Sequence, residues 1–328
     1  MNIHLFEKLR TEGLVSDTAV QAVKTEESNR LFSLHWEIKT LLYLGVLLLS
    51  GGLGILIYKN IDTIGHQVIL LFIGLLCAGC FSYCIRKKAP FSWQKVISPN
   101  AFFDYALLLG CLTFVTFIGY LQFEYTAFGK AYGLATFIPF AVLAVSAYYF
   151  DHLGVLSMAI TNLAAWMGIA VTPFQVLSAN DFSSDPIIYT GVLLGGILLL
   201  LAIISTRRNL KKHFTFTYQN FGTNIIFIAC ISALCVFGNN PMLWLLIIIM
   251  AAVSVYTFKQ AFREGSFYFV LITVLYAYVG ISIIVFRLLV LTNDIGAVYL
   301  GLLYVIGSAI GVILLLINLN KKIKHARI

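Results

Sequence analysis

The sequence has few charged residues. Asp, Glu, Lys and Arg together make up only 11% of the 328 residues, while hydrophobic residues make up 60%. A soluble globular domain carries about 25% charged residues, because its surface must be wetted. This shortage of charge excludes a water-soluble chain of this length and indicates that much of its surface faces lipid.

Ionisable side chains are almost absent from the ten long apolar runs of the sequence. Apart from Asp104, one turn inside the third run, these runs contain no Asp, Glu, Lys, Arg or His. Proton relays and ion-coupled pumps need such groups at membrane depth, so the sequence argues against both. The runs do not alternate apolar and polar residues, which excludes a β-barrel.

Recognisable motifs of catalysis and cofactor binding are also missing. There is no Gly-rich phosphate loop, no nucleophile elbow and no HExxH, so a soluble type of active site is not expected. The six Cys residues show no metal-ligand spacing. We therefore expect no metal and no cofactor. The positive charges cluster at the ends of apolar runs, a pattern of membrane topology that argues against a nucleic-acid partner.

What the sequence does contain is a series of apolar runs, each long enough to cross a hydrocarbon core of about 30 Å as a helix. Without water in the bilayer core, backbone groups must pair within each run, so the runs are expected to be helices. The fold class is therefore an all-α, polytopic transmembrane bundle of about ten spans. The predicted spans are Leu41–Tyr58, Val68–Ile85, Ala101–Leu121, Ala131–Phe150, Leu153–Val171, Ile187–Thr206, Phe221–Gly238, Pro241–Phe258, Gly265–Phe286 and Ile295–Ile317.

Three parts of the chain are predicted. Residues 1–37 carry many charges and read as a cytoplasmic helical hairpin without a cleavable signal peptide, in which Ser16 is placed to cap the second helix. Residues 38–318 form the bundle, and residues 319–328 form a basic cytoplasmic tail. All but three of the 22 Lys and Arg residues then fall on one side, the exceptions being Lys59, Lys130 and Arg287. By the positive-inside rule, both termini are expected in the cytoplasm of a bacterial cell, with the spans in its inner membrane.

Two stretches near the N-terminus resemble a known family. LRTEGLVSDTAVQAVKTEE, at residues 9–27, and LYLGVLLLSGGLGILIYKNID, at residues 42–62, resemble the bacterial predicted membrane proteins grouped as domain of unknown function twenty-one fifty-seven. The resemblance covers about residues 5–85. It implies a multi-span topology and an envelope location, and it implies no particular activity.

Several polar residues are candidates for a site. Asn162 lies at the centre of the fifth span, where an amide needs a partner. It is either an interhelical contact or, together with Pro139 in the preceding span, part of a substrate path. Asn60, Asp62 and His66 form a polar outer turn that is either a solvated connection or a docking point for a ligand. Asp104 and Arg287 are expected to be interface charges.

Small residues mark candidate packing faces. Cys77, Cys80 and Cys84 lie on one stripe of the second span, as expected for helix packing. GxxxG pairs occur at Gly191 and Gly195 and at Gly307 and Gly311. Such pairs let helices approach closely, within one chain or between copies. Residues 1–37 and the GxxxG faces are thus the expected surfaces for a protein partner or a homo-oligomer, and membrane lipids are the expected surroundings.

Three hypotheses for function remain. The first is a non-enzymatic envelope scaffold or sensor, which the lack of buried charge and the short loops favour. The second is a transporter or flippase for a lipid or a weakly polar solute, which needs a cavity near Asn162 and Pro139. The third, ranked last, is a membrane enzyme acting on lipid-linked substrates. Only the pair Asp151 and His152 suggests it, and a tight turn explains that pair better.

Overall fold

The structure, a computed structural model, describes residues 9–10, 12, 14–21, 35–59, 65–171, 185–237, 240–292 and 295–325. Within these residues the regular structure is helical and contains no strand. The chain separates into two units, residues 1–63 and residues 64–328. The first apolar helix belongs to the N-terminal unit.

The N-terminal unit contains helix α3 (His35–Lys59), whose 25 residues include the first predicted span. Before it, the hydroxyl of Ser16 accepts a hydrogen bond of 3.3 Å from the backbone N–H of Ala19, so the predicted N-cap is present. Arg10 forms an ion pair of 3.0 Å with Asp17. These local contacts fix the start of the second N-terminal helix.

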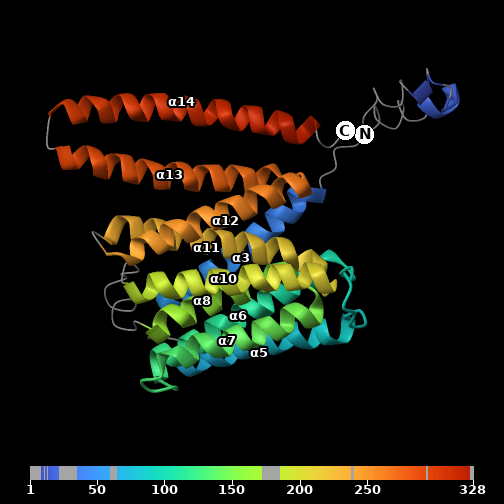
Figure 1. Ribbon diagram of the computed structural model, residues 1–328. Helices are drawn as coiled ribbons and strands as arrows, with labels where there is room; N and C mark the ends of the chain where they lie inside the picture. The colour runs from blue at the N-terminus through green and yellow to red at the C-terminus, as the bar shows by residue number, and fades with distance from the viewer. Residues whose placement is uncertain are drawn as a thin grey trace. The chain divides into compact units, whose positions relative to one another are not determined.

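The larger unit is a set of long helices that run alternately in opposite directions (Figure 1). In the described residues, nine helices are long and apolar enough to cross a membrane. With α3 they account for the ten predicted runs, and the all-α, polytopic class is confirmed. The helices are α5 (His66–Lys87), α6 (Ala101–Tyr125), α7 (Tyr132–Phe150), α8 (Leu153–Val171), α10 (Asp185–Arg208), α11 (Thr215–Val236), preceded by the 3-10 turn η1 (Lys212–Phe214), α12 (Met242–Glu264), α13 (Phe267–Thr292) and α14 (Ile295–His325).

Because the helices alternate in direction, every second connection of the larger unit lies at the same end. We call this the basic end, and the other the opposite end. At the opposite end, the described basic residues are Lys130 and Arg287. Helix α14 continues through most of the predicted tail to His325. The described Lys and Arg residues of the basic end are Arg86, Lys87, Lys88, Lys95, Arg207, Arg208, Lys211, Lys212, Lys259, Arg263, Lys321, Lys322 and Lys324.

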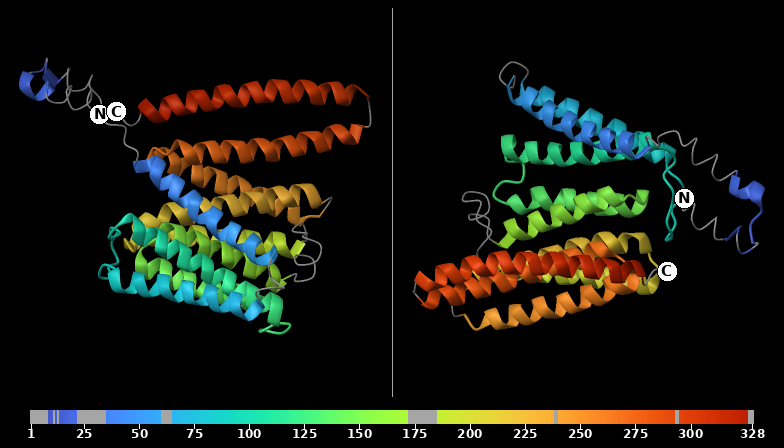
Figure 2. Two further views of the ribbon diagram at one scale, coloured as in Figure 1. Left: turned by 180° about the vertical axis from the view of Figure 1, so that it is seen from behind. Right: turned by 90° about the horizontal axis from the view of Figure 1, so that it is seen from above.

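The hydrophobic core of the larger unit consists of three clusters in series. One joins α5, α6, α7 and α8 to α10 and α11, the second joins α10 and α11 to α12 and α13, and the third joins α12 and α13 to the end of α14. Figures 1 and 2 accordingly show α10 and α11 between α5–α8 and α12–α14. The α10–α11 pair therefore connects the two halves of this unit.

One predicted boundary is wrong by almost two turns. Helix α11 begins at Thr215, whereas the sequence predicts the span from Phe221. The polar residues placed in the loop are instead helical and have partners on neighbouring helices. Gln260 donates to the side-chain oxygen of Gln219 at 3.2 Å, and Tyr268 donates to that of Asn220 at 2.8 Å. Such hydrogen bonds let polar side chains lie inside a helical bundle.

Candidate functional site

The turn between α7 and α8 places two ionisable residues inside the basic end. Asp151 ends α7 in the left-handed conformation, with φ of 58°, and its backbone N–H group donates to the carbonyl of Ala147. His152 accepts a hydrogen bond of 3.2 Å from the backbone N–H of Val155 through Nδ1. The tight turn predicted at these residues is present, and both side chains point into protein contacts.

Asp151 is the centre of a buried ionic cluster. Its Oδ1 accepts from Lys211 Nζ at 2.9 Å and from His213 Nε2 at 2.7 Å, and its Oδ2 accepts from the backbone N–H of Val96 at 2.5 Å. The side chains of Asp151 and Lys211 are only 2% and 1% exposed. We call Asp151, Lys211 and His213 the Asp151 cluster. It joins the α7–α8 turn, the segment before α11 and the connection of residues 88–100.

A second carboxylate and imidazole lie close by. Asp104, in the first turn of α6, has its Oδ1 at 3.8 Å from His152 Nε2. Because His152 Nδ1 accepts from a backbone N–H group, Nε2 carries the proton in the neutral ring. Asp104 is buried, so its side chain faces the protein and is not the snorkelling interface charge that the sequence predicts.

The space beside the Asp151 cluster is too small for a substrate. The cavity bounded by Asp151, Lys211 and the connection of residues 88–100 has a volume of about 10 Å³, and a single water needs about 10–15 Å³. Both carboxylate oxygens also accept hydrogen bonds already, from three donors in total. This arrangement fastens segments together and leaves no room for a reacting molecule.

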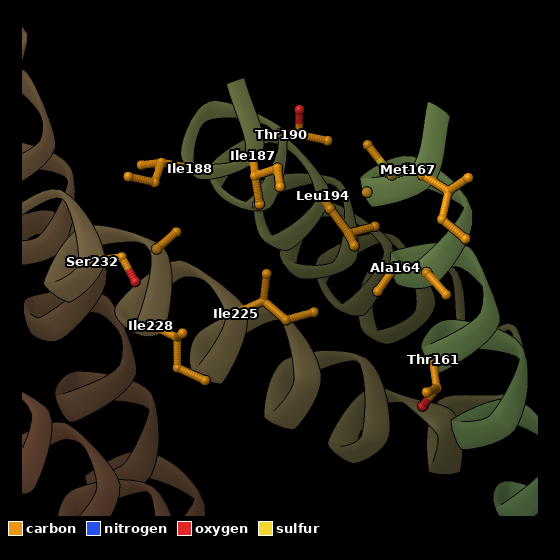
Figure 3. Close-up of a pocket in the computed structure, with 15 residues that line it drawn as sticks. Thr161, Ala164, Met167, Ile187, Ile188, Thr190, Leu194, Ile225, Ile228 and Ser232 are labelled. Atoms are coloured by element: carbon orange, nitrogen blue, oxygen red, sulfur yellow. The ribbon is translucent and has the colours of Figure 1, made fainter. Parts of the chain in front are cut away.

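A hollow with apolar walls lies between α8, α10 and α11 (Figure 3). It has a volume of about 530 Å³, is partly open, and no ionisable side chain lines it. Its residues come from the second half of α8, the first half of α10 and the middle of α11. It therefore lies toward the opposite end. Residues that line it include Thr161, Ala164, Met167 and Gly168 on α8, Ile187, Ile188, Thr190, Gly191 and Leu194 on α10, and Ile225, Ile228, Ala229 and Ser232 on α11.

The few polar groups of this α8–α10–α11 pocket are mostly turned to their own helices. The hydroxyl of Thr161 donates to the carbonyl of Ser157 at 2.9 Å, and that of Thr190 donates to the carbonyl of Pro186 at 2.6 Å. These bonds satisfy the hydroxyl protons without a ligand. What remains is an apolar wall that suits hydrocarbon and lacks the groups needed for acid–base chemistry.

The structure does not join Asn162 and Pro139 into one site. Asn162 donates to the carbonyl of Met158 on its own helix at 2.9 Å, so the interhelical hydrogen bond expected from the sequence is not needed. Pro139 is buried within α7. Neither residue lines the α8–α10–α11 pocket. The side-chain amide of an Asn within a helix can donate to the backbone carbonyl four residues earlier. The prediction from the sequence did not consider this intrahelical hydrogen bond.

The predicted outer turn is described only in part. Asn60 and Asp62 lie outside the described residues. His66, at the start of α5, forms a hydrogen bond of 2.7 Å through Nδ1 with the hydroxyl of Tyr120, and its Nε2 lies 3.3 Å from a carboxylate oxygen of Glu124. His66 thus links α5 to the end of α6.

The remaining candidates have packing roles. Arg287 donates to the carbonyl of Phe237 at 2.9 Å, just beyond the end of α11. Cys77 and Cys84 face α6, where their thiols lie 3.5 Å and 3.9 Å from the carbonyls of Gly110 and Phe103. The Cys stripe is thus a packing face, as the sequence predicts.

Sequence reasoning missed the partners of Asp151. Lys211 and His213 belong to the strongly basic segment of residues 207–213, and nothing in their local sequence distinguishes Lys211 from the exposed Lys212. The sequence feature that could have indicated these partners is the carboxylate of Asp151. Asp104, Asp151 and Glu264 are the described acidic residues near the basic end, and a lone acid among many bases is expected to pair.

One family model matches residues in the N-terminal half of the chain. No curated protein and no solved structure matches the chain. The predicted resemblance covered about residues 5–85, and the observed match is longer. Residues 7–156 match the family model described as Predicted membrane protein (DUF2157), which confirms the resemblance and the character of an integral membrane protein.

Proposed function

We propose that the protein is a non-enzymatic scaffold or sensor of the bacterial cytoplasmic membrane that binds a lipid acyl chain in the α8–α10–α11 pocket. The pocket itself supports this proposal: about 530 Å³ of space with apolar walls, within the usual range of ligand pockets. The ionisable groups near the α7–α8 turn adjoin a cavity of about 10 Å³. The ionisable groups thus lie outside the α8–α10–α11 pocket, and this favours binding over catalysis.

The charge distribution supports an orientation in which the basic end faces the cytoplasm. Both termini then lie on the cytoplasmic side, and the pocket lies in the outer half of the membrane. In this setting residues 1–37 are available to a cytoplasmic partner. Gly307 and Gly311 have open space where a Cβ would stand, so this face of α14 is available to lipid or to another helix.

The orientation predicts different labelling of two exposed lysines. With the exposed native Cys235 replaced by Ser, a membrane-impermeant maleimide should label the variant Lys130→Cys in intact cells and should not label Lys95→Cys, because only residue 130 faces the outside. After cell lysis both variants should be labelled. Labelling of Lys95→Cys in intact cells would reverse the orientation and move the pocket to the inner half of the membrane.

Filling the pocket should displace the lipid. A Cβ at Gly168 on α8 would meet no atom within 4 Å, and Gly168 lines the pocket. We therefore expect Gly168→Leu to fold normally and to occupy part of the pocket. Overfilling a packed site costs about 1–3 kcal/mol, so retention of lipid should fall roughly 5-fold to 150-fold. The measurement is crosslinking of the purified chain to a phospholipid with a photoreactive acyl chain, followed by peptide mapping.

Gly196→Leu is the matched control for this experiment. Gly196 on α10 also has open space around its Cβ position, but it does not line the pocket. Crosslinks should map to α8, α10 and α11 in the wild type and in Gly196→Leu. Equal crosslinking in the two variants would contradict the proposal. Movement of a fluorescent lipid between leaflets of proteoliposomes, lost in Gly168→Leu, would instead favour the flippase alternative.

A further inference from the structure

A second cavity lies at the basic end, between the last turns of α10 and α12. Its volume is about 330 Å³. Three cationic side chains line it, Arg207 from α10 and Lys259 and Arg263 from α12. We call it the α10–α12 pocket. Its neutral lining residues are Ile203, Thr206, Tyr256 and Gln260.

Helical spacing explains why these side chains meet. Lys259 and Arg263 are one turn apart on α12, as are Ile203 and Arg207 on α10. Residues four apart lie on the same face of a helix. The two cationic faces point toward one another across the ends of α10 and α12, and the hydrophobic residue Ile203 lies on the side toward the middle of α10.

The positive charges of the α10–α12 pocket are not neutralised within the described chain. Among the described residues, no carboxylate forms an ion pair with Arg207, Lys259 or Arg263. The nearby acid, Glu264, accepts a hydrogen bond of 2.8 Å from Gln260 Nε2. Three unpaired cations around one cavity repel one another, and a bound anion relieves this repulsion.

Polar groups behind the pocket are held in place. Gln260 donates through the same Nε2 to the side-chain oxygen of Gln219 on α11 at 3.2 Å. Gln219 is 1% exposed, and its Nε2 has no hydrogen-bond partner among the described residues. A buried donor without an acceptor costs free energy. The wall formed by Gln260 is thus fixed by a hydrogen bond between two helices, α11 and α12.

We propose that the α10–α12 pocket binds the phosphate group of an anionic membrane lipid. The cations stand where the apolar parts of α10 and α12 end, which is the level of lipid headgroups in a spanning bundle. Arginine suits phosphate because its planar guanidinium donates two parallel hydrogen bonds. This site is separate from the acyl-chain pocket: Arg207 is ~25 Å along α10 from Thr190, at 1.5 Å per residue.

The test measures phosphatidylglycerol binding to the purified full chain by native mass spectrometry. Each Lys or Arg near a membrane surface contributes about a fivefold gain in affinity for anionic lipid. Arg207→Gln with Arg263→Gln should therefore weaken binding roughly 25-fold, and Lys259→Gln alone about fivefold. Binding of phosphatidylcholine, which has no net charge, should be weak in all variants.

The control removes equal charge outside the pocket. Arg208 and Lys212 are exposed at the same end and do not line the pocket, so Arg208→Gln with Lys212→Gln should leave binding within about twofold of wild type. Equal losses in both double variants would overturn the specific site in favour of general surface charge. If the double variant Arg207→Gln with Arg263→Gln does not fold, the single variant Lys259→Gln provides the test. Unchanged binding of phosphatidylglycerol by Lys259→Gln would overturn the proposal.

Inorganic phosphate distinguishes the source of the anion. Added to the same complex at millimolar concentration, it should leave phosphatidylglycerol bound, because the lipid tails add contacts and hold the headgroup at the interface. Full displacement of the lipid by phosphate at that concentration would assign the pocket to a soluble anion and overturn the lipid assignment.

Discussion

Replacing Gly195 with alanine is expected to destabilise the larger unit by about 3 kcal/mol, the upper part of the usual range for overpacking. A Cβ at this position would overlap Ile226 Cγ1 and would stand 2.8 Å from the carbonyl oxygen of Gly222. Real Cβ atoms do not approach other atoms this closely. The side chain of Ile226 can rotate, but the backbone of Gly222 can move only if the helices α10 and α11 separate.

This separation affects more than one contact. Gly222 faces Gly195 across the helix crossing, and a Cβ at Gly222 would stand 2.9 Å from the Gly195 carbonyl oxygen. Residues of α10 and α11 belong to both large core clusters. Widening the crossing therefore loosens the packing of α5–α8 and of α12 and α13 at once, because close packing transmits displacement.

Gly196→Ala is the control for this prediction. It makes the same chemical change one residue later on α10, where a Cβ would meet nothing within 4 Å. Alanine also has a better helix propensity than glycine. In detergent, Gly196→Ala should keep or raise the midpoint temperature of unfolding, and Gly195→Ala should lower it and reduce the monodisperse fraction. Equal midpoints for the two variants would contradict the close crossing.

The sequence predicts the helices of this protein well because the membrane imposes one strong rule. A backbone surrounded by hydrocarbon must satisfy its own hydrogen bonds, so length and composition are enough to place the spans. The rule fails where polar residues are buried among helices. Gln219 and Asn220 read as loop, yet their partners Gln260 and Tyr268 on α12 and α13 keep them in α11.

Binding sites are less predictable because they depend on packing between distant segments. Of the two GxxxG pairs that lie within predicted spans, Gly191 and Gly195 lie close to α11, whereas Gly307 and Gly311 have open space around them. Nothing in either pattern reveals this difference. The α8–α10–α11 pocket likewise arises from small residues, such as Ala164 and Gly191, on helices whose distance is set by the Gly195 crossing.

Replacing Asp151 with asparagine is expected to cost about 3–5 kcal/mol, the range for breaking a buried ion pair by removing one partner. Asparagine keeps the size of the side chain and tolerates the left-handed backbone at residue 151, with φ of 58°. The change thus removes mainly the negative charge. Lys211, 1% exposed, would then carry a buried positive charge without its counter-ion.

A second substitution distinguishes two causes of the lower stability of Asp151→Asn, the unpaired charge of Lys211 and the loss of a hydrogen bond. Lys211→Met in the Asp151→Asn background removes the unpaired cation and should restore part of the stability, because a neutral pair avoids the cost of an isolated buried charge. Lys212→Met is the control: Lys212 is adjacent, exposed and outside the cluster. That substitution should change the midpoint of unfolding little.

The Asp151 cluster also predicts a local effect that general destabilisation does not. Asp151 holds the backbone N–H of Val96, and the backbone N–H of Lys211 donates to the carbonyl of Trp93 at 2.8 Å. In asparagine a single amide oxygen replaces the two carboxylate oxygens, so the Val96 N–H must compete for it with Lys211 and His213, and this attachment weakens. Trypsin should therefore cleave after the exposed Lys95 faster in Asp151→Asn than in Gly195→Ala. The two variants are compared at temperatures that lie the same number of degrees below their own midpoints of unfolding. Equal cleavage rates would mean that Asp151 contributes to stability without fastening this connection.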